Sequence, residues 1–265
     1  MRTTIGKLAG IIIALILTSI TSVEAADVGG PASPAKMEKI GINIIYEKYR
    51  RDVQISSREH VLRIPGDEVT VPAFSESGVQ DEVRLMARLS FPVGSRALIH
   101  LDGGVTDEES SQDVDPILGG GVRVLAYQSN AIDVSIFGSA HYVPKREYKF
   151  YFTDIDLNTL AFTQEESYWE ANGGVVLSHP VALESGPELT LYGGLMISVL
   201  KGDEDWEIQL SDVGGIGEYE GQLEDDGAVS VLGGLALLFN EQVGMRVEGR
   251  FVNQTSVSVA VVVHL

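Results

Sequence analysis

The stretch VRLMARLSF at residues 83–91 places an apolar side chain at every second position. In an extended strand one face would carry Val83, Leu85, Ala87, Leu89 and Phe91. The opposite face would carry Arg84, Met86, Arg88 and Ser90. Because successive side chains of a β-strand point to opposite faces, this period of two predicts a strand with one apolar face.

The same alternation recurs along most of the chain. It predicts ten strands, with eight or twelve as alternatives. After residue 25 no segment approaches the ~20 apolar residues that a transmembrane helix requires. The ten expected strands are 38–49, 81–92, 96–106, 116–128, 131–143, 166–178, 188–200, 227–239, 242–252 and 255–265.

The connections between these strands alternate in length. Tight turns are expected at residues 92–96, 129–131 and around 241, with a somewhat longer one at 179–187. The opposite ends carry polar stretches near 50–80, 106–115, 144–165 and 201–226, and a short one at 253–254. Short turns at one end and long loops at the other are typical of transmembrane antiparallel up-and-down β-barrels.

Composition excludes several classes of protein. The chain has 265 residues and no cysteine, so a disulfide scaffold and a thiolate metal site are excluded. Its formal charge of −19 disfavours nucleic-acid binding, because phosphate backbones would repel it. An apolar content of 44% argues against disorder.

The N-terminus has the layout of a secretory signal peptide. A short positive region with Arg2 and Lys7 precedes an apolar run at 8–20, and Ala25 lies at a suitable cleavage position. Residues 1–25 are therefore expected to be a signal peptide, residues 26–36 a flexible lead-in and residues 37–265 the barrel.

Alternation alone does not say which face points inward. A soluble lipocalin-like binding barrel would have an apolar interior, whereas a small membrane barrel has a polar one. The polar faces carry five acids and five bases, a balance that suits a crowded lumen where each charge needs a partner. The expected lumen network is Glu47, Arg84, Arg88, Asp102, Arg123, Asp133, Glu170, Arg246, Glu248 and Arg250.

The excess negative charge is expected in the long loops, as in the run 203–205. Divalent cations could bridge such carboxylates to anionic lipopolysaccharide. Aromatic residues near both strand ends suggest two interfacial belts. The belt residues would be Tyr46, Tyr49, Tyr142, Tyr168, Trp169 and Trp206 at one end, and Phe91, Tyr127, Tyr192 and Phe239 at the other.

On this pattern, residues 37–265 resemble a Gram-negative outer-membrane β-barrel of the small porin-like or OmpA-like type. The resemblance implies a place in the outer membrane among lipid and lipopolysaccharide, and insertion by the barrel assembly machinery. The chain ends in Val263-His264-Leu265, which keeps the alternation and lacks the terminal aromatic residue usual in the family.

Two enzyme classes are alternatives. Ser139 and His141 share a strand face and suggest an outer-membrane hydrolase acting on lipid A. Asp133, on the same face, lies over ~25 Å from His141 at ~3.3 Å per residue, so the strand alone forms no triad. An omptin-like protease would use acidic residues and a histidine at the extracellular mouth, where His60 and His141 are the candidates.

The sequence therefore favours a non-enzymatic barrel with a structural, adhesive or narrow-pore role. Paired charges would fill its lumen, because a barrel of this size has an interior largely occupied by side chains. No cofactor and no metal site is expected. The alternatives are the outer-membrane enzyme and the soluble lipocalin-like barrel.

Overall fold

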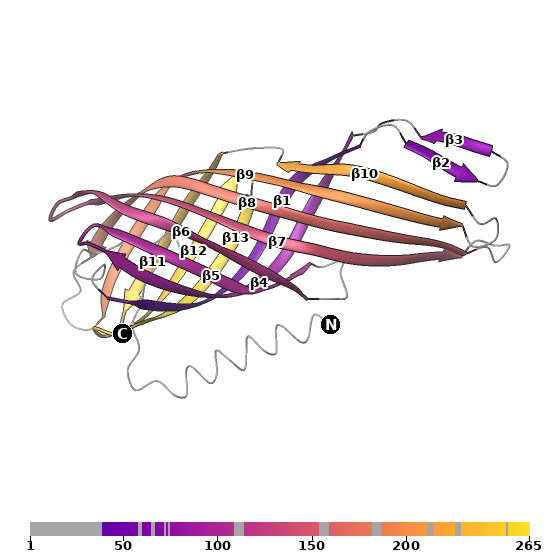
Figure 1. Cartoon of the computed structure of the whole chain (residues 1–265). Helices are drawn as coiled ribbons and strands as arrows, with labels where there is room; N and C mark the ends of the chain where they lie inside the picture. The colour runs from indigo at the N-terminus through magenta and orange to yellow at the C-terminus, as the bar shows by residue number, and fades with distance from the viewer. Residues whose placement is uncertain are drawn as a thin grey trace.

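The computed structural model describes residues 39–57, 60–64, 67–71, 73, 75–108, 114–153, 159–181, 187–210, 215–225, 229–252 and 254–265. The expected signal peptide and lead-in lie outside these residues. The described part of the chain is built from β-strands (Figure 1). They are β1 (Gly41–Ser57), β2 (His60–Ile64), β3 (Asp67–Val71), β4 (Ser75–Val93), β5 (Ala97–Glu108), β6 (Asp115–Gln128), β7 (Asp133–Thr153), β8 (Thr159–Val181), β9 (Glu188–Leu210), β10 (Gly215–Asp225), β11 (Val229–Leu238), β12 (Val243–Val252) and β13 (Gln254–His264).

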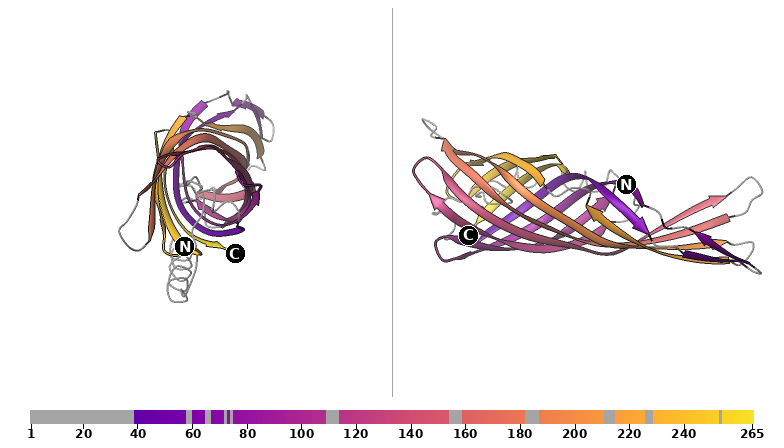
Figure 2. Two further views of the ribbon diagram at one scale, coloured as in Figure 1. Left: turned by 90° about the vertical axis from the view of Figure 1, so that its left-hand side faces the viewer. Right: turned by 90° about the horizontal axis from the view of Figure 1, so that it is seen from above.

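Ten of these strands close into an antiparallel barrel. The order β11-β12-β13-β1-β4-β5-β6-β7-β8-β9 becomes a ring because β9 also pairs with β11. The view along the axis shows this ring (Figure 2). Each of the ten strands overlaps one of the ten expected from the sequence, so the predicted antiparallel barrel is confirmed.

The barrel has a polar inside and an apolar outside. Leu195 is 61% exposed, whereas its neighbour Met196, which points inward, is 2% exposed. The buried positions include arginines and glutamates from many strands. This polarity contradicts the lipocalin-like alternative, which requires an apolar interior. Exposed apolar residues of the outer face include Leu101, Leu118, Ile136, Leu177, Leu195, Ile197 and Val257.

The expectation of long polar loops was wrong in part. The ladders of β7, β8 and β9 continue beyond the predicted strand ends, and the pairs run out to Thr153↔Thr159 and Leu160↔Leu210. The hairpin of β9 with β10 and the hairpin of β2 with β3 extend the sheet further, beyond one end of the ring (Figures 1 and 2). The expected loop at 50–80 therefore carries four stretches of strand, and the acidic run 203–205 lies within β9.

A register shift in β7 separates the barrel wall from this extension. Between Val143 and Arg146 the strand contains a β-bulge opposite β8. Val143 is buried on the inner side, and after the bulge Arg146 is buried there too, so the inward positions change from odd to even numbers. Bulges insert an extra residue and re-aim the side chains that follow.

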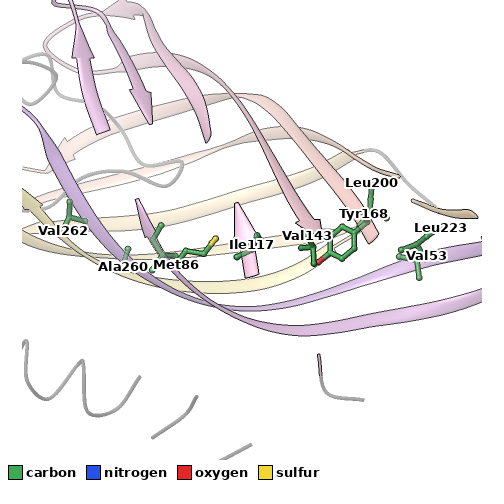
Figure 3. Close-up of a cluster of buried hydrophobic side chains, with 10 residues drawn as sticks. Val53, Met86, Ile117, Val143, Tyr168, Leu200, Leu223, Ala260 and Val262 are labelled. Carbon is green, nitrogen blue, oxygen red and sulfur yellow. The ribbon is translucent and has the colours of Figure 1, made fainter. Parts of the chain in front are cut away.

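Apolar side chains occupy the space between the lumen charges. One buried cluster includes Met86, Ile117, Val143, Leu200 and Val262 (Figure 3). These residues come from strands all around the ring, so their packing helps to fill the interior. No helix among the described residues is long and apolar enough to cross a membrane.

The two sides of the wall can be distinguished with introduced cysteines, because the natural chain has none. In a lipid bilayer, Leu195→Cys is expected to react with a lipid-soluble maleimide. Met196→Cys is expected to react only after denaturation, because its side chain points into a packed lumen. Equal reactivity at both positions in the native protein would contradict the polarity described here.

Candidate functional site in the barrel lumen

Arg84 lies at the centre of a buried ion-pair network. Its Nε lies 3.0 Å from Oε2 of Glu82, two positions along β4, and its Nη1 lies 2.9 Å from Oε2 of Glu170 on β8. All three side chains are buried. A buried arginine is tolerated only where carboxylates compensate the lost hydration, and here two of them lie in direct contact.

The Glu82 carboxylate accepts hydrogen bonds from donors on four strands, β4, β5, β7 and β8. Arg146 donates from Nη2 to Oε1 over 2.7 Å, and the Tyr168 hydroxyl donates to the same oxygen over 2.6 Å. Gln80 donates to Oε1 at 2.9 Å, and the Thr106 hydroxyl donates to Oε2 at 3.0 Å. Together with Arg84 these donors account for the hydrogen-bonding capacity of a fully buried carboxylate.

Two tyrosines provide further support for the cations. The guanidinium carbon of Arg84 lies 4.0 Å from the centroid of the Tyr49 ring, and that of Arg146 lies 4.9 Å from the Tyr168 ring. Both distances are within the range of a cation–π interaction. Tyr49 and Tyr168, expected in an interfacial belt, therefore face the lumen instead, and Tyr192 is likewise buried inside.

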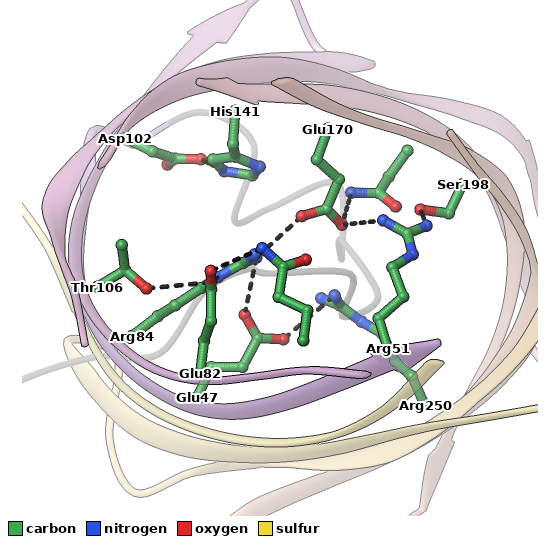
Figure 4. Close-up of polar contacts among 12 residues, drawn as sticks. Glu47, Arg51, Glu82, Arg84, Asp102, Thr106, His141, Glu170, Ser198 and Arg250 are labelled. Carbon is green, nitrogen blue, oxygen red and sulfur yellow. Dashed lines mark hydrogen bonds and ion pairs between the residues drawn. The ribbon is translucent and has the colours of Figure 1, made fainter. Parts of the chain in front are cut away.

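The network continues across the lumen to the C-terminal strands (Figure 4). Nη1 of Arg84 lies 3.9 Å from Oε2 of Glu47, whose Oε1 lies 3.2 Å from Nη1 of Arg250. Nε of Arg250 also donates to Oε1 of Glu248 over 3.1 Å. Nη1 of Arg51 lies 3.8 Å from Oε1 of Glu170. With Glu82 and Arg146 included, four arginines and four glutamates form one connected network that branches at Arg84. Each of its ion pairs joins an arginine to a glutamate.

A second group lies nearer the short turns. Arg88 holds the Asp102 carboxylate with two parallel bonds, Nε to Oδ1 at 2.6 Å and Nη2 to Oδ2 at 2.8 Å. Nε2 of His141 lies 2.8 Å from the same Oδ2. His100 approaches this oxygen more loosely, at 3.7 Å. The bidentate geometry is the strongest form of an arginine–carboxylate contact.

Gly119 makes the contact between His141 and Asp102 possible. Residue 119 on β6 lies directly between them, paired with Asp102 on one side and with His141 on the other. A Cβ at this position would lie 2.3 Å from Cδ2 of His141 and 2.5 Å from the carbonyl oxygen of Ala140. The imidazole therefore crosses β6 over a position that has no side chain.

The structure places all ten residues expected in the lumen on the inner face. Seven of them take part in the ion pairs above, most of which join residues of different strands. Arg123 and Arg246 are buried on the same side, in the half of the lumen near the short turns. Asp133 begins β7 at the short-turn rim and is only partly buried.

Sequence reasoning missed several members of the network. Glu82 lies two residues before Arg84 and therefore on the same face of β4 as Arg84 and Arg88. The alternation of this strand could have identified it as an inward residue. Arg51 and Arg146 lie in stretches that were expected to be loops. Because of the bulge before Arg146, the alternation of the preceding residues does not predict that this side chain points inward.

Neither enzyme alternative gains a catalytic arrangement from this geometry. His141 finds its acidic partner on β5, two strands away, and that carboxylate is already held by Arg88. Ser139 and His141 both line a cavity in the lumen, which has a volume of only about 50 Å³. His60 lies in β2, not in a loop. Within the described residues, no three His, Asp or Glu side chains form a group suited to a metal ion.

The close approach at Gly119 can be tested by Gly119→Ala. The added methyl group would collide with His141 and with the backbone of β7. We expect a loss of about 1–3 kcal/mol in the free energy of unfolding, measured by urea titration in lipid vesicles. Gly103→Ala is the matched control, because the nearest atom to its Cβ would be a Leu118 methyl at 3.8 Å.

The central position of Arg84 leads to a second test. Arg84→Met would leave Glu82 and Glu170 without their shared cation, which is expected to cost about 3–5 kcal/mol of unfolding free energy. The comparison is the pair of Lys48 with Asp81 on the outer face, whose side chains are 57% and 22% exposed. Lys48→Met is expected to cost less than about 1 kcal/mol. Equal losses of unfolding free energy in the two variants would contradict a larger contribution from the buried ion pairs of Arg84.

Comparisons with known proteins find similar folds at low sequence identity. No family model and no curated protein matches the chain. The translocator domain of the autotransporter NalP from Neisseria meningitidis is 12% identical, with 98% of this chain and 96% of that chain covered and a TM-score of 0.47. The toluene transporter TodX from Pseudomonas putida is 8% identical, with 92% and 94% covered and a TM-score of 0.31. The transport unit of the autotransporter AIDA-I from Escherichia coli is 9% identical, with 96% of each chain covered and a TM-score of 0.30.

Proposed function

We propose that this protein is an integral outer-membrane β-barrel with a structural role and a lumen closed by its own ion pairs. The polarity of the wall is the observation that carries the proposal. Apolar side chains such as Leu101, Leu195 and Ile197 are more exposed than the buried arginines and glutamates of the lumen. Water would not favour this arrangement, whereas the hydrocarbon core of a bilayer would.

Aromatic residues support the same placement. Tyr142 and Trp169 are 49% and 42% exposed on the outer face, near the end from which the extended strands project. Tyr127 and Phe239 are exposed near the short turns. Aromatic side chains favour the two lipid–water interfaces, so these four residues suit opposite borders of a membrane belt.

The short-turn end would face the periplasm. The ring places the start of β1 beside the end of β13, through the pair Gly41↔His264. The short connection at 94–96 lies at the same end, and outer-membrane barrels have short turns on the periplasmic side. Export by the expected signal peptide at 1–25 and insertion by the barrel assembly machinery belong to this proposal.

The lumen contents support closure. The cavity lined by residues of both polar groups has a volume of about 50 Å³, room for only a few water molecules. Arg84 and Glu170, which are paired with each other, line it toward the extracellular side, and Arg88, paired with Asp102, lines it nearer the short turns. Any passage through such a lumen is narrow, because both ions and solutes would have to displace compensated charges.

Planar bilayers test both parts of the proposal. The protein purified from membranes is expected to need detergent for folding and to show single-channel conductance far below that of a sixteen-stranded porin. Arg84→Ala combined with Glu82→Ala removes two central side chains and is expected to raise the conductance. A wild-type conductance at the level of a general porin would contradict closure, and a stable, detergent-free monomer would contradict membrane insertion.

A further inference from the structure

A groove lies on the outer surface of the barrel near the bases of the extended strands. It has a volume of about 330 Å³ and is lined by residues of β7, β8, β9 and β10. Four of them occupy one continuous row of paired positions, Tyr142↔Trp169, Trp169↔Lys201 and Lys201↔Glu224. Asp203 and Gln222 are paired with each other one row further from the membrane belt.

This groove lies at the border between the apolar and the charged parts of the outer face. On β9 the outward residues Leu195, Ile197 and Val199 are apolar, whereas the next outward residues are Lys201 and Asp203. On β8 the same border follows Trp169. In the proposed membrane orientation, the groove would therefore open at the depth of the lipid headgroups in the outer leaflet.

The side chains around the groove combine flat aromatic surfaces with hydrogen-bonding groups. Tyr142 and Trp169 are about half exposed, so their rings remain available for contact. Lys201 and Glu224 are joined by a 2.9 Å bond that fixes one donor and one acceptor beside the rings, and both side chains remain more than half exposed. Asp203 and Gln222, also exposed, add an acceptor and an amide.

From this arrangement we propose that the groove binds the sugar headgroup of a membrane glycolipid. The C–H faces of a pyranose ring would pack against Trp169 and Tyr142, and its hydroxyls would bond Asp203, Gln222 and Lys201. The volume suits a small ligand, since binding pockets span about 300–1,000 Å³. The charged residues that line the groove are Lys201, Asp203 and Glu224, so the groove has a net negative charge. This charge disfavours the binding of a bare phosphate group and favours the binding of neutral hydroxyl groups.

The proposal rests on the membrane placement argued above, and the intrinsic fluorescence of the protein tests it directly. The chain has two tryptophans, so Trp206→Phe leaves Trp169 as the sole reporter. This variant, folded in detergent micelles, is titrated with rough-type lipopolysaccharide in the presence of EDTA. A saturable change in Trp169 emission is expected, with no such change for phosphatidylglycerol at equal concentration.

Variants then assign the binding to the groove. Asp203→Ala in the same background is expected to weaken lipopolysaccharide binding about tenfold, because it removes a charged acceptor of a sugar hydroxyl. Asp107→Ala removes an acid of the same outer face on β5, remote from the groove, and is expected to leave the affinity unchanged. Equal weakening by both variants would indicate a general charge effect and overturn the proposal.

The remaining outcomes also decide the question. A change in emission that EDTA abolishes would show cation-bridged phosphate binding, and an equal change with phosphatidylglycerol would show simple contact with headgroups; either result overturns the sugar site. Circular dichroism and electrophoretic mobility of the unheated sample report separately on folding. A barrel that folds in detergent without responding to lipopolysaccharide contradicts only this inference, whereas a barrel that needs no detergent contradicts the proposed function itself.

Discussion

The lumen of this barrel depends on one constraint: every charge placed inside must meet an opposite charge. A closed sheet turns alternate residues of each strand inward, and in this chain those positions include arginines and glutamates of most strands. These side chains are buried in the packed interior, where neighbouring side chains replace most of their hydration. The pairing of Arg84 with Glu82 and Glu170 is therefore a condition for closing the ring as well as a consequence of it.

The same constraint explains why the network crosses between distant parts of the chain. Glu47 on β1 meets Arg250 on β12, and Arg84 on β4 meets Glu170 on β8. Such contacts form only after the strands have assembled in the correct register, because a slip of one residue would turn each charge toward the outer face. The ion pairs consequently favour a single register for strands whose apolar faces alone are rather uniform.

Alternation made the barrel predictable from sequence, because a period of two runs along most of the length of each of the ten strands. It also identified Arg84, Arg88, Glu170 and Glu248 as inward residues. Partners were not predictable in the same way. His141 meets Asp102 across β6 because Gly119 leaves space, and this depends on three strands at once. The polar stretches beyond the barrel wall lack a continuous apolar face, so their strands were mistaken for loops.

The bulge between Val143 and Arg146 separates the side-chain directions of the two ends of β7. The inserted residue reverses which positions face inward. Odd-numbered residues point into the lumen before the bulge, and even-numbered residues point to that side after it. The alternation of apolar outward residues up to Tyr142 therefore does not determine which residues beyond Arg146 point outward. A single strand can thereby serve two environments, with one extra residue as the boundary between them.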